Sequence, residues 1–577
     1  MIIVGINAYH ADASAAIFVN GIMIAAIEEE RFTRVKHWAG FPKLAIEFCL
    51  KEAGISYNEV DFFAIGRDPK ARMFQKFLYV AKNPGGSFTA IRDRLYNRRK
   101  VASVAEELAM ISGLPVENFN HKVKNIEHHR SHLASAFFAS PFKDAACLSI
   151  DGSGDFSTTM TGIGSGNNIK VLKSVNFPHS IGIFYTAFTQ LLGYPHYGDE
   201  YKLMGMAPYG EPKYTDALHD VIHLTDDGLF KLNLAYFRKG TSGVITYGDD
   251  HIPEVAPMYS AYLIKKFGAP RTKEEPLGQY HKDLAASVQK MTETVIFHIL
   301  NHLHKVTGLD SVCIAGGVAQ NSVANGKITR HTPFKNVYIP SAGHDAGISM
   351  GAALFVQHQQ KQLTRQAIYS AYTGSRFTNE IIKKTLETKG IAYTQLNDEK
   401  IYDRVTDCLI NGGIVGWMNG RSEFGPRALG ARSILADPRR SDAKEILNSK
   451  IKRRESFRPF APSILIEYVS EYFEIDEPVP FMEKVFPVKE EKQAIIPAVT
   501  HVDGTGRLQT VDKNISPKYH ALIEAFRKKT GVPVLLNTSF NENEPIVNSP
   551  EEALACYLRT DMDMLVMENI LISRKTY

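Results

Sequence analysis

Cysteine is scarce in this chain of 577 residues, which contains only five. They are scattered through apolar runs such as AACLSI and SVCIAGG, and no two are spaced as CxxC. This usage argues against a disulfide framework and against a metal held by clustered thiolates. We expect the five thiols to be buried and inert, in a cytoplasmic protein.

Long apolar runs are also missing, and the charge balance is modest. No apolar run approaches the ~18 residues that span a bilayer, and MIIVGINAYHADAS lacks the basic segment and apolar stretch of a signal peptide. The formal net charge is +5, too small over this length to call for nucleic acid. One basic stretch, RDRLYNRRK at 92–100, is typical of a solvated face. We therefore expect no membrane and no nucleic-acid partner.

What the chain does have is length and an ordinary globular composition. At 577 residues it exceeds what one hydrophobic core supports, and it is 44% hydrophobic and 22% charged. A polar, glutamine-rich stretch, QHQQKQLTRQ, follows the apolar GAALFV and precedes a new pattern, FTNEIIKKTLETKG. We predict two domains that meet there, one over 1–360 and the other over 367–577.

Two segments share one plan of strand, acidic or small-residue loop, and hairpin. The first predicts strands over 2–5 and 15–19 around the loop NAYHADAS, then an Asn20-Gly21 turn and the return strand IMIAAIEEE. The second runs ACLSID, GSGD, TTMTGIG, GSGNN and IKVLKSVNF. Such paired hairpins resemble those that hold ATP phosphates in the actin, sugar-kinase and Hsp70 superfamily. Small residues let backbone N–H groups approach phosphate, while a carboxylate, here Asp12, holds the cation.

A glycine pair follows a later apolar segment. VCIAGGVAQNSVANGKI predicts a buried strand, a Gly316-Gly317 turn and a helix running through Asn321. Glycines at such a turn let a ligand approach, and the helix N-terminus favours an anion. A plain tight turn is the alternative, and a lone glycine pair would favour it. Because two phosphate hairpins precede it, we predict that Gly316, Gly317 and Asn321 bind ATP.

A histidine-rich segment, IEHHRSHLASAFFAS, has helical apolar spacing. On a helix His128 and His132 share one face, whereas His129 points about 100° away. An HxxxH pair alone is more often structural. Asp151, at the end of ACLSID, and Asp345, in SAGHDAG, add two carboxylates. Two imidazoles and two carboxylates suit Fe(II), Zn(II) or Mn(II), and the sequence does not choose among them.

Eight motifs occur in one order along the chain: EEERFTRVKH, HHRSHLASAF, GDEYKLMGMAPYG, IAGGVAQN, SAGHDAG, GRSEFGPRALGARSIL, FRPFAPS and LNTSFNENEPIV. In these motifs the chain resembles the carbamoyltransferase family that includes nodulation-factor, tobramycin, cephamycin and novobiocin carbamoyltransferases. The resemblance covers essentially the whole chain. It implies a mixed α/β protein with a duplicated actin-like N-terminal domain and a C-terminal domain similar to the YrdC/Sua5 fold.

The resemblance also implies where the chemistry of the N-terminal domain lies. The positions that match the family's iron ligands are those of the metal set above: His128, His132, Asp151 and Asp345. ATP would bind, with magnesium, beside the matching glycines. The acceptor-binding lysine of the family's ERFTRxKH stretch corresponds to Lys36.

The C-terminal half contains a set of anion-binding candidates: Arg427, Arg458, Arg507 and Asn537. Guanidinium groups present paired donors in one plane, which suits a phosphate and carbamoyl ligand. The alternative is that such arginines brace the domain through carboxylates such as Glu423 or Asp437. Four polar residues on glycine-rich or apolar-flanked loops favour the anion site. They also match the family's carbamoyl phosphate pocket.

The reaction implied is carbamoyl transfer to a hydroxyl of a small metabolite, with carbamoyl phosphate and ATP forming carbamoyl-adenylate. His10, in NAYHADAS, is the candidate base, and a locally hydrogen-bonded loop histidine is the equal alternative. Family members place this histidine directly before the aspartate, whereas Ala11 intervenes here. The sequence leaves the acceptor and the oligomeric state open, a homodimer among the options.

Three rival functions share parts of this pattern. A tRNA threonylcarbamoyl-type transferase has related folds but predicts a basic surface for RNA. A non-catalytic nucleotide-binding module of the actin or Hsp70 type needs no HxxxH pair with two aspartates. A sugar kinase accounts for the N-terminal half alone.

Overall fold

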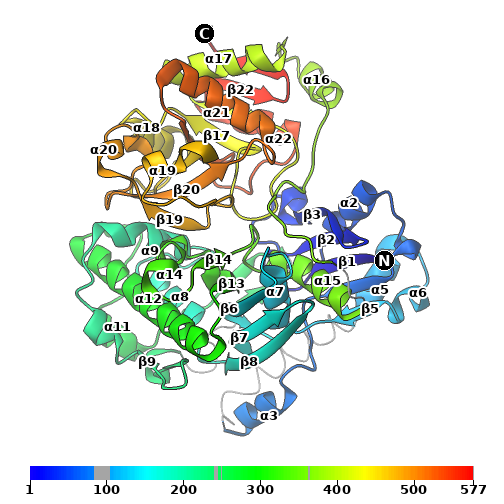
Figure 1. The fold of residues 1–577 in the computed structure, drawn as a ribbon, viewed down its shortest axis with the longest axis vertical. Helices are drawn as coiled ribbons and strands as arrows, with labels where there is room; N and C mark the ends of the chain where they lie inside the picture. The colour runs from blue at the N-terminus through cyan, green and yellow to red at the C-terminus, as the bar shows by residue number, and fades with distance from the viewer. Residues whose placement is uncertain (83–103, 239–244, 249, 361–363, 576–577) are drawn as a thin grey trace. The chain divides into compact units, whose positions relative to one another are not determined.

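The computed structural model (Figure 1) describes residues 1–82, 104–238, 245–248, 250–360 and 364–575. The chain divides into two units. Unit 1 comprises Met1–Ala324 and Ile328–Ile368, and unit 2 comprises Asn325–Lys327 and Tyr369–Tyr577. Both units combine helices with strands, which confirms the predicted mixed α/β class.

The first sheet of unit 1 is built from strands β1 to β5. Their bounds are Ile2–Asn7, Ser14–Val19, Ile22–Glu28, Phe62–Ile65 and Val123–Asn125. The order is β3-β2-β1-β4-β5; β1–β2 and β2–β3 are antiparallel, whereas β1–β4 and β4–β5 are parallel. The predicted Asn20-Gly21 turn has φ of 50° and 93°, the positive values that a two-residue hairpin loop favours.

The second sheet of unit 1 repeats this plan. Strands β6, β7, β8, β13 and β14 span Asp144–Gly154, Ser157–Ser165, Asn168–Asn176, Ser311–Ala315 and Asn336–Tyr338. Their order, β8-β7-β6-β13-β14, and their directions match the first sheet strand for strand. Because order and direction both recur, the predicted duplication within this domain is confirmed.

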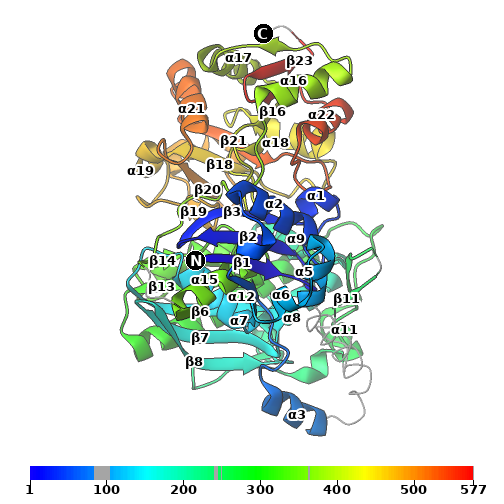
Figure 2. The same cartoon turned by 90° about the vertical axis from the view of Figure 1, so that its right-hand side faces the viewer.

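Two helices, α7 (His128–Phe137) and α15 (Gly347–Gln360), lie between these sheets, as Figure 2 shows. Helix α15 packs against β1, β2, β4 and α7, and α7 packs against β6, β7 and β13. The two helices approach each other so closely that a Cβ on Gly351 would lie only 1.9 Å from the carbonyl oxygen of Ser131, so only glycine fits there. The start of each helix is therefore held firmly relative to both sheets.

The other described helices of unit 1 that have seven or more residues are α2, α3, α5, α8, α9, α11 and α12, which span Lys43–Ala53, Met73–Lys82, Val104–Ser112, Ile181–Leu191, Glu200–Met206, Ala261–Phe267 and Gln279–Thr307. Among the described residues, no helix has both the length and the apolar character to cross a membrane. All five cysteines are free and buried, and burial raises the pKa of the Cys147 thiol well above its usual value. The expectation of buried thiols is confirmed.

Unit 2 is an α/β domain built on one nine-stranded sheet, the class expected of the YrdC-like part. Strands β15 to β23 span Thr394–Gln395, Val415–Met418, Arg432–Ala436, Ala461–Leu465, Lys484–Pro487, Thr505–Val511, Val534–Ser539, Met564–Met567 and Ile570–Ser573. Their order is β15-β23-β22-β16-β17-β21-β18-β20-β19. The longer helices are α16, α17, α21 and α22, at Asn379–Thr388, Asp398–Ile410, Pro517–Thr530 and Pro550–Arg559.

Candidate metal centre and anion site

The two predicted imidazole ligands lie in the first two turns of α7. His128 and His132 are both buried, with ring centroids 4.8 Å apart, as an i, i+4 pair on a helix requires. His129 turns elsewhere: its Nδ1 lies 2.7 Å from the hydroxyl of Ser149. The spacing argument therefore selected the correct two of the three histidines for one face.

The two predicted carboxylates meet these imidazoles from separate elements. Asp151 lies on β6, and Asp345 lies two residues before α15. Asp151 Oδ2 is 3.0 Å from His128 Nε2 and 3.4 Å from His132 Nε2. Asp345 Oδ1 is 3.7 Å and 3.4 Å from the same two nitrogens. One ligand atom from each of the four residues lies within 4.8 Å of the others.

The residues present fit a divalent ion. Both ring nitrogens of His132 and Oδ1 of Asp345 are buried and, among the described residues, have no hydrogen-bond partner. Buried polar atoms without partners are costly and rare in native structures. A cation bound between the two imidazoles and two carboxylates would satisfy Nε2 of His132 and the orphaned carboxylate oxygen. That donor set suits Fe(II), Zn(II) or Mn(II).

The charges of this group offset one another. Burial alone would raise the pKa of Asp151, but His128 and His132 hold it well below its usual value. Burial likewise opposes protonation of His132, yet Asp151 and Asp345 together raise its pKa to about 9. The carboxylates thus favour positive charge at the imidazoles, and a bound cation would take the place of that proton.

Neighbouring loops hold the ligands in place. The Gly317 N–H donates to Asp151 Oδ1 over 3.0 Å. The His128 backbone N–H donates to Asp155 over 2.9 Å. Gly154 lies against the His128 ring so closely that a Cβ there would sit 2.1 Å from it. The second hairpin loop and the glycine-pair turn therefore position two side chains of the candidate metal group.

The glycine-pair segment differs from its prediction in one respect. A continuous helix was expected through Asn321, but the chain forms a 3₁₀ turn, Gly317–Gln320, and a separate short helix, Ser322–Asn325. The break occurs because Asn321 Oδ1 accepts from the backbone N–H of Ala324, as a capping residue does.

The predicted ATP-binding groups of this turn already have protein partners. The amide of Asn321 exchanges two hydrogen bonds with Gln289, of 2.9 and 3.0 Å. Gly316 has φ of 105°, and a Cβ on it would lie 2.2 Å from the carbonyl oxygen of Ile150. Packing and backbone conformation both require glycine there. The role of Asp12, Gly316, Gly317 and Asn321 toward ATP stays a prediction.

His10 and Lys36 lie in different surroundings. The His10 side chain is 17% exposed, and its Nδ1 is 2.5 Å from Asp345 Oδ2. It contacts a predicted metal ligand, an arrangement that commonly orients such a ligand. Lys36 is exposed, whereas the next residue, His37, turns inward to Asp12. The acceptor-binding role of Lys36 stays a prediction.

In unit 2 the predicted anion-binding residues gather around β20. Arg507 lies on this strand, and its Nε is buried without a hydrogen-bond partner among the described residues. Burial, followed by the charges of Arg427, Arg454 and Arg458, holds the pKa of Arg507 well below its usual value. The predicted arginines therefore lie close enough together to act on one another, and Arg454 joins them.

Asn537 lies on β21 beside the same group. Its Nδ2 donates to the Ala428 carbonyl, the Ser463 hydroxyl and Gln509 Oε1, while its Oδ1 is buried without a partner among the described residues. Gln509 and Arg507 are two residues apart on β20, so their side chains share one face of the sheet. The unpaired guanidinium nitrogen and the unpaired amide oxygen therefore lie on one face.

Comparison with known proteins decides the family. A family model described as "Carbamoyltransferase N-terminus" matches residues 2–354, and one described as "Carbamoyltransferase C-terminus" matches residues 406–574. This chain belongs to the carbamoyltransferase family. The first match falls in unit 1 apart from Asn325–Lys327, and the second falls in unit 2. The resemblance of the eight motifs is confirmed.

Relatives of this carbamoyltransferase extend over most of its length. The protein sll1178 of Synechocystis is 43% identical over 99% of this chain and 96% of its own. Nodulation protein NolNO of Sinorhizobium fredii is 37% identical over 99% and 80%, and nodulation protein NolO of Bradyrhizobium diazoefficiens is 40% identical over 78% and 79%. Among solved structures, a ROK hexokinase from Thermus thermophilus covers 63% of this chain and 100% of its own at 14% identity, with a TM-score of 0.30. A score this low adds nothing to the topology described above.

Sequence reasoning missed several groups of the carbamoyltransferase that lie at these sites. Arg454 lies four residues before Arg458, so the segment that supplied one arginine could have supplied both. Lys452 is buried, and its ammonium donates to the backbone carbonyls of Ser539 and Asn541 and to their side-chain oxygens. No local pattern marks a lysine that anchors a distant loop.

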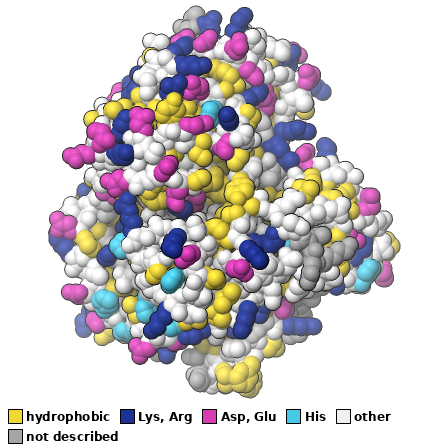
Figure 3. All heavy atoms as spheres, viewed as in Figure 1, with side chains coloured by type: hydrophobic (Ala, Val, Ile, Leu, Met, Phe, Trp, Pro, Cys, Tyr) yellow, Lys and Arg dark blue, Asp and Glu magenta, His cyan; other side chains and the backbone are white. Residues whose placement is uncertain are grey.

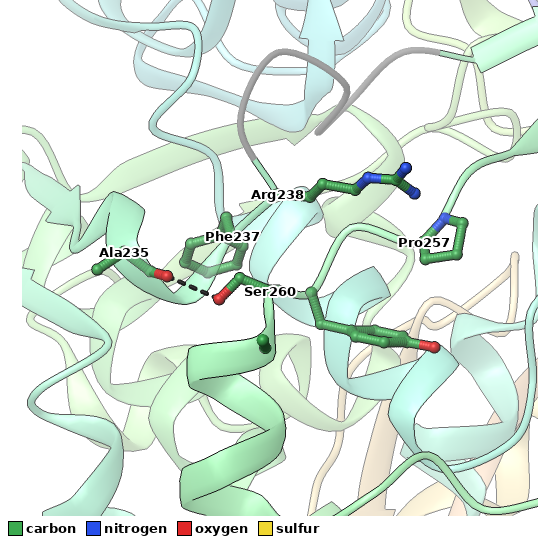
Figure 4. A pocket seen from close by; sticks show the side chains of 7 residues that line it. Ala235, Phe237, Arg238, Pro257 and Ser260 are labelled. Atoms are coloured by element: carbon green, nitrogen blue, oxygen red, sulfur yellow. Dashed lines mark hydrogen bonds between the residues drawn. The ribbon is translucent and has the colours of Figure 1, made fainter.

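A surface pocket of about 510 Å³ lies elsewhere in unit 1 (Figure 4). Its lining residues are Ala235, Phe237, Arg238, Pro257, Tyr259, Ser260 and Ala261. Within it the Ser260 hydroxyl donates to the Ala235 carbonyl over 2.7 Å, and Arg238 supplies the guanidinium. None of the predicted site residues lines it, and the buried metal group is the better candidate for catalysis.

Proposed function

We propose that this carbamoyltransferase is an ATP-dependent O-carbamoyltransferase. In unit 2, water would displace phosphate from the carbonyl carbon of carbamoyl phosphate, and the carbamate formed would attack the α-phosphorus of ATP, releasing pyrophosphate and giving carbamoyl-adenylate. In unit 1, the carbamoyl group would pass to a hydroxyl of a small metabolite and AMP would leave. Mg-ATP, carbamoyl phosphate and the acceptor are then its partners, in the cytoplasm.

The unpaired pair in unit 2 carries this proposal. Arg507 offers a buried donor among positive charges, and Asn537 offers a buried acceptor on the same face of the sheet. Carbamoyl phosphate presents the complementary groups, since its phosphate accepts hydrogen bonds and its amino group donates them. Arg427 and Arg458 would share the phosphate charge. Arg458 Nη1 also lies 3.6 Å from Glu455 Oε2, whereas Arg507 has no ion-pair partner among the described residues.

The metal group supplies the chemistry of the second step. A divalent ion held by His128, His132, Asp151 and Asp345 would polarise the carbamoyl carbonyl as a Lewis acid; the family resemblance favours Fe(II), with Zn(II) and Mn(II) as alternatives. Around that ion, the Gly317 N–H orients Asp151 and His10 contacts Asp345. The burial of the four candidate metal ligands keeps water from the reactive carbamoyl group.

The rival functions lose support. The family matches set aside a non-catalytic nucleotide-binding module and a sugar kinase. A tRNA-binding transferase would need a basic surface, but the net charge is only +5, and Figure 3 shows both signs interspersed over the face in view. The basic stretch at 92–100 lies outside the described residues.

One experiment tests the proposed function. The full-length enzyme, loaded with Fe(II), is given ATP, labelled carbamoyl phosphate and a panel of alcohols: an aminoglycoside, a lipo-oligosaccharide, a guanidinium alkaloid, a cephem and a polyketide. We expect pyrophosphate release that depends on carbamoyl phosphate, and a carbamoyl mass shift on one class of acceptor. Product without ATP, or no pyrophosphate release, would contradict the adenylate route.

A further inference from the structure

A second titratable pair, Asp12 and His37, lies beside the metal centre. Asp12 Oδ1 is 2.7 Å from His37 Nδ1. The Asp12 side chain is 8% exposed and that of His37 is 24% exposed, so the pair is largely shielded yet reachable. The other carboxylate oxygen of Asp12 is 4.0 Å from Nε2 of His344, the residue immediately before Asp345.

The backbone is strained at both members of this pair. Asp12 has φ of 58° and His37 has φ of 57°, in the left-handed region that residues with a Cβ seldom adopt. Hydrogen bonds hold the two segments in this state: the Ala13 N–H donates to the Trp38 carbonyl over 2.9 Å, and the His37 N–H donates to Glu30 over 2.8 Å. Such over-determined strain clusters at active sites.

The arrangement leaves one imidazole nitrogen for chemistry. If Nδ1 of a neutral His37 donates to Asp12, its Nε2 carries the lone pair of a base. Gly198 lies beside that atom, with φ of 81°, and a Cβ there would be only 2.5 Å from Nε2. Because residue 198 is glycine, no side chain at that position crowds Nε2 of His37.

Tyr197 connects the pair with the metal centre. Its ring centroid is 5.1 Å from that of His37, edge to face. Burial, followed by the charges of Asp12, Asp345 and Asp151, raises the pKa of the Tyr197 hydroxyl well above its usual value. One side chain thus contacts His37 and lies within the field of two metal-binding carboxylates.

Two other assignments for these residues fit less well. His10 directs Nδ1 at Asp345, which suits ligand positioning better than proton removal from an acceptor. Asp12, Glu30 and His37 lie close enough together to hold a cation. However, Glu30 Oε2 accepts from the backbone N–H of His37, and Asp12 Oδ1 faces its ring nitrogen Nδ1, so a hydrogen-bonded pair of Asp12 and His37 accounts for the geometry directly.

We propose that His37 removes the proton from the acceptor hydroxyl, and that Asp12 is the positioning residue that fixes the tautomer and orientation of His37. This inference rests on the proposed function. In the step, the acceptor oxygen bonds to the carbamoyl carbon while its proton passes to His37 Nε2. The bond from that carbon to the adenylate oxygen breaks, and its electron pair leaves with AMP.

The sign of the pH dependence follows from the groups around His37. Those facing it are Asp12, Glu30, Lys36, Tyr197 and Glu200. Burial lowers the pKa of His37, but Asp12 and Glu30 outweigh it and raise the value overall, while Lys36 opposes them. A base must be neutral, so transfer should increase as pH rises through this titration. Removing the Asp12 charge should move the midpoint to lower pH.

The test uses the full-length Fe(II)-loaded enzyme, added carbamoyl-adenylate and the panel alcohol that wild-type enzyme labels fastest. Single-turnover transfer is measured from pH 5 to pH 9, and pyrophosphate release from ATP and carbamoyl phosphate is measured separately. His37→Gln should slow transfer by about 10²–10⁴-fold and abolish its rise with pH. Pyrophosphate release should stay within about twofold of wild type, because that step belongs to unit 2 in the proposed function. Asp12→Asn should retain a pH-dependent rate with a lower midpoint.

Matched variants separate a base from a structural residue. His520→Gln removes another histidine that faces a carboxylate, Glu467 at 3.2 Å, and should leave transfer unchanged. Gly198→Ala should slow transfer by crowding Nε2. Gly54→Ala imposes similar backbone strain, at φ of 66°, but has open space around its Cβ. It should therefore leave the transfer rate unchanged. If His37→Gln destabilises the fold, the Gly198→Ala comparison and the Asp12→Asn midpoint still decide.

Two failures are distinguishable. If wild-type enzyme labels no alcohol and releases no pyrophosphate, the proposed function itself is wrong. If wild-type enzyme does both, but His37→Gln keeps the wild-type rate and midpoint, or Asp12→Asn leaves the midpoint in place, the dyad alone is overturned.

Discussion

The two candidate sites of this enzyme have opposite electrostatic designs. In unit 1, two imidazoles face two carboxylates, so the charges offset one another, and within this group the buried atoms without partners among the described residues belong to His132 and Asp345. In unit 2, Arg507 is surrounded by three further guanidinium groups that repel it. The first arrangement is complementary to a cation and the second to an anion. The two units therefore differ in the sign of the charge that their candidate sites would accept.

Buried histidines at the two sites show the same contrast. Carboxylates overcome burial at His132 and raise its pKa to about 9. At His501, burial together with Arg507 and Lys444 outweighs Asp503 and lowers the pKa to about 4. The same side chain therefore favours its charged form in one unit and its neutral form in the other.

Removing one of the four candidate metal ligands of unit 1 should have the largest effect. We expect His132→Ala to slow carbamoyl transfer by about 10³-fold, because several kcal/mol of Lewis-acid stabilisation are lost. Pyrophosphate release should persist, since unit 2 is untouched. Metal content by mass spectrometry and single-turnover transfer test this together. A variant that binds no metal but transfers at the wild-type rate would refute the assignment.

Removing the guanidinium of Arg507, at the centre of the arginine group in unit 2, should have the next largest effect. Arg507→Met should slow pyrophosphate release by about tenfold to hundredfold, the cost of a charge-assisted hydrogen bond. In phosphate-free buffer its melting temperature should equal or exceed that of wild type, because a repelled buried charge has been removed. Wild type should gain more stability from added phosphate than the variant does. Lower stability without phosphate, with no loss of activity, would indicate a structural arginine.

The exposed lysine of unit 1 should have a smaller effect. Lys36→Ala should raise the acceptor KM or slow transfer by about tenfold, the low end for one charge-assisted hydrogen bond, because solvent screens the side chain. Lys143→Ala, at another surface lysine of unit 1, serves as the control. Steady-state kinetics with varied acceptor measure the change, and an unaltered KM and rate would return Lys36 to the solvated surface.

The last expected effect is on the pH dependence of stability rather than on a rate. The pKa of His501 falls from 6.5 in the unfolded chain to about 4 in the fold, so the unfolded chain binds its proton first as pH falls. Its stabilising contribution is present above pH 6.5 and is lost progressively as pH falls toward 4. His501→Gln should flatten the decline in the free energy of unfolding across that window by roughly 1–3 kcal/mol. Denaturant titrations at pH 4.5 and pH 7 measure it.

Local patterns predicted a large part of the fold and site. The Asn20-Gly21 turn, the duplicated hairpin and the shared face of His128 and His132 all follow from spacing over a few residues. The continuous helix through Asn321 was wrong, because a side-chain hydrogen bond from this residue caps a new turn. Propensity alone does not reveal such competition between side chain and backbone.

Distant pairings could not be read in the same way. The sequence offered no sign that the Gly317 N–H would be used by Asp151, or that Asn321 would pair with Gln289. Neither did it show that His37 would turn to Asp12 while Lys36 faces solvent. These contacts join residues far apart along the chain, and their existence depends on how sheets and helices pack.

Several local features follow from the sequence alone: an HxxxH pair on one helix face, glycines at tight turns, and arginines and an asparagine in the C-terminal half. Which of these side chains contact one another depends on the tertiary structure. The fold brings Asp151, on β6, and Asp345, just before α15, to the same two imidazoles, adds Arg454 to the candidate anion site, and places His37 beside Asp12. Side-chain spacing is set by short-range backbone geometry, whereas convergence of separate segments is set by burial and packing of the whole domain.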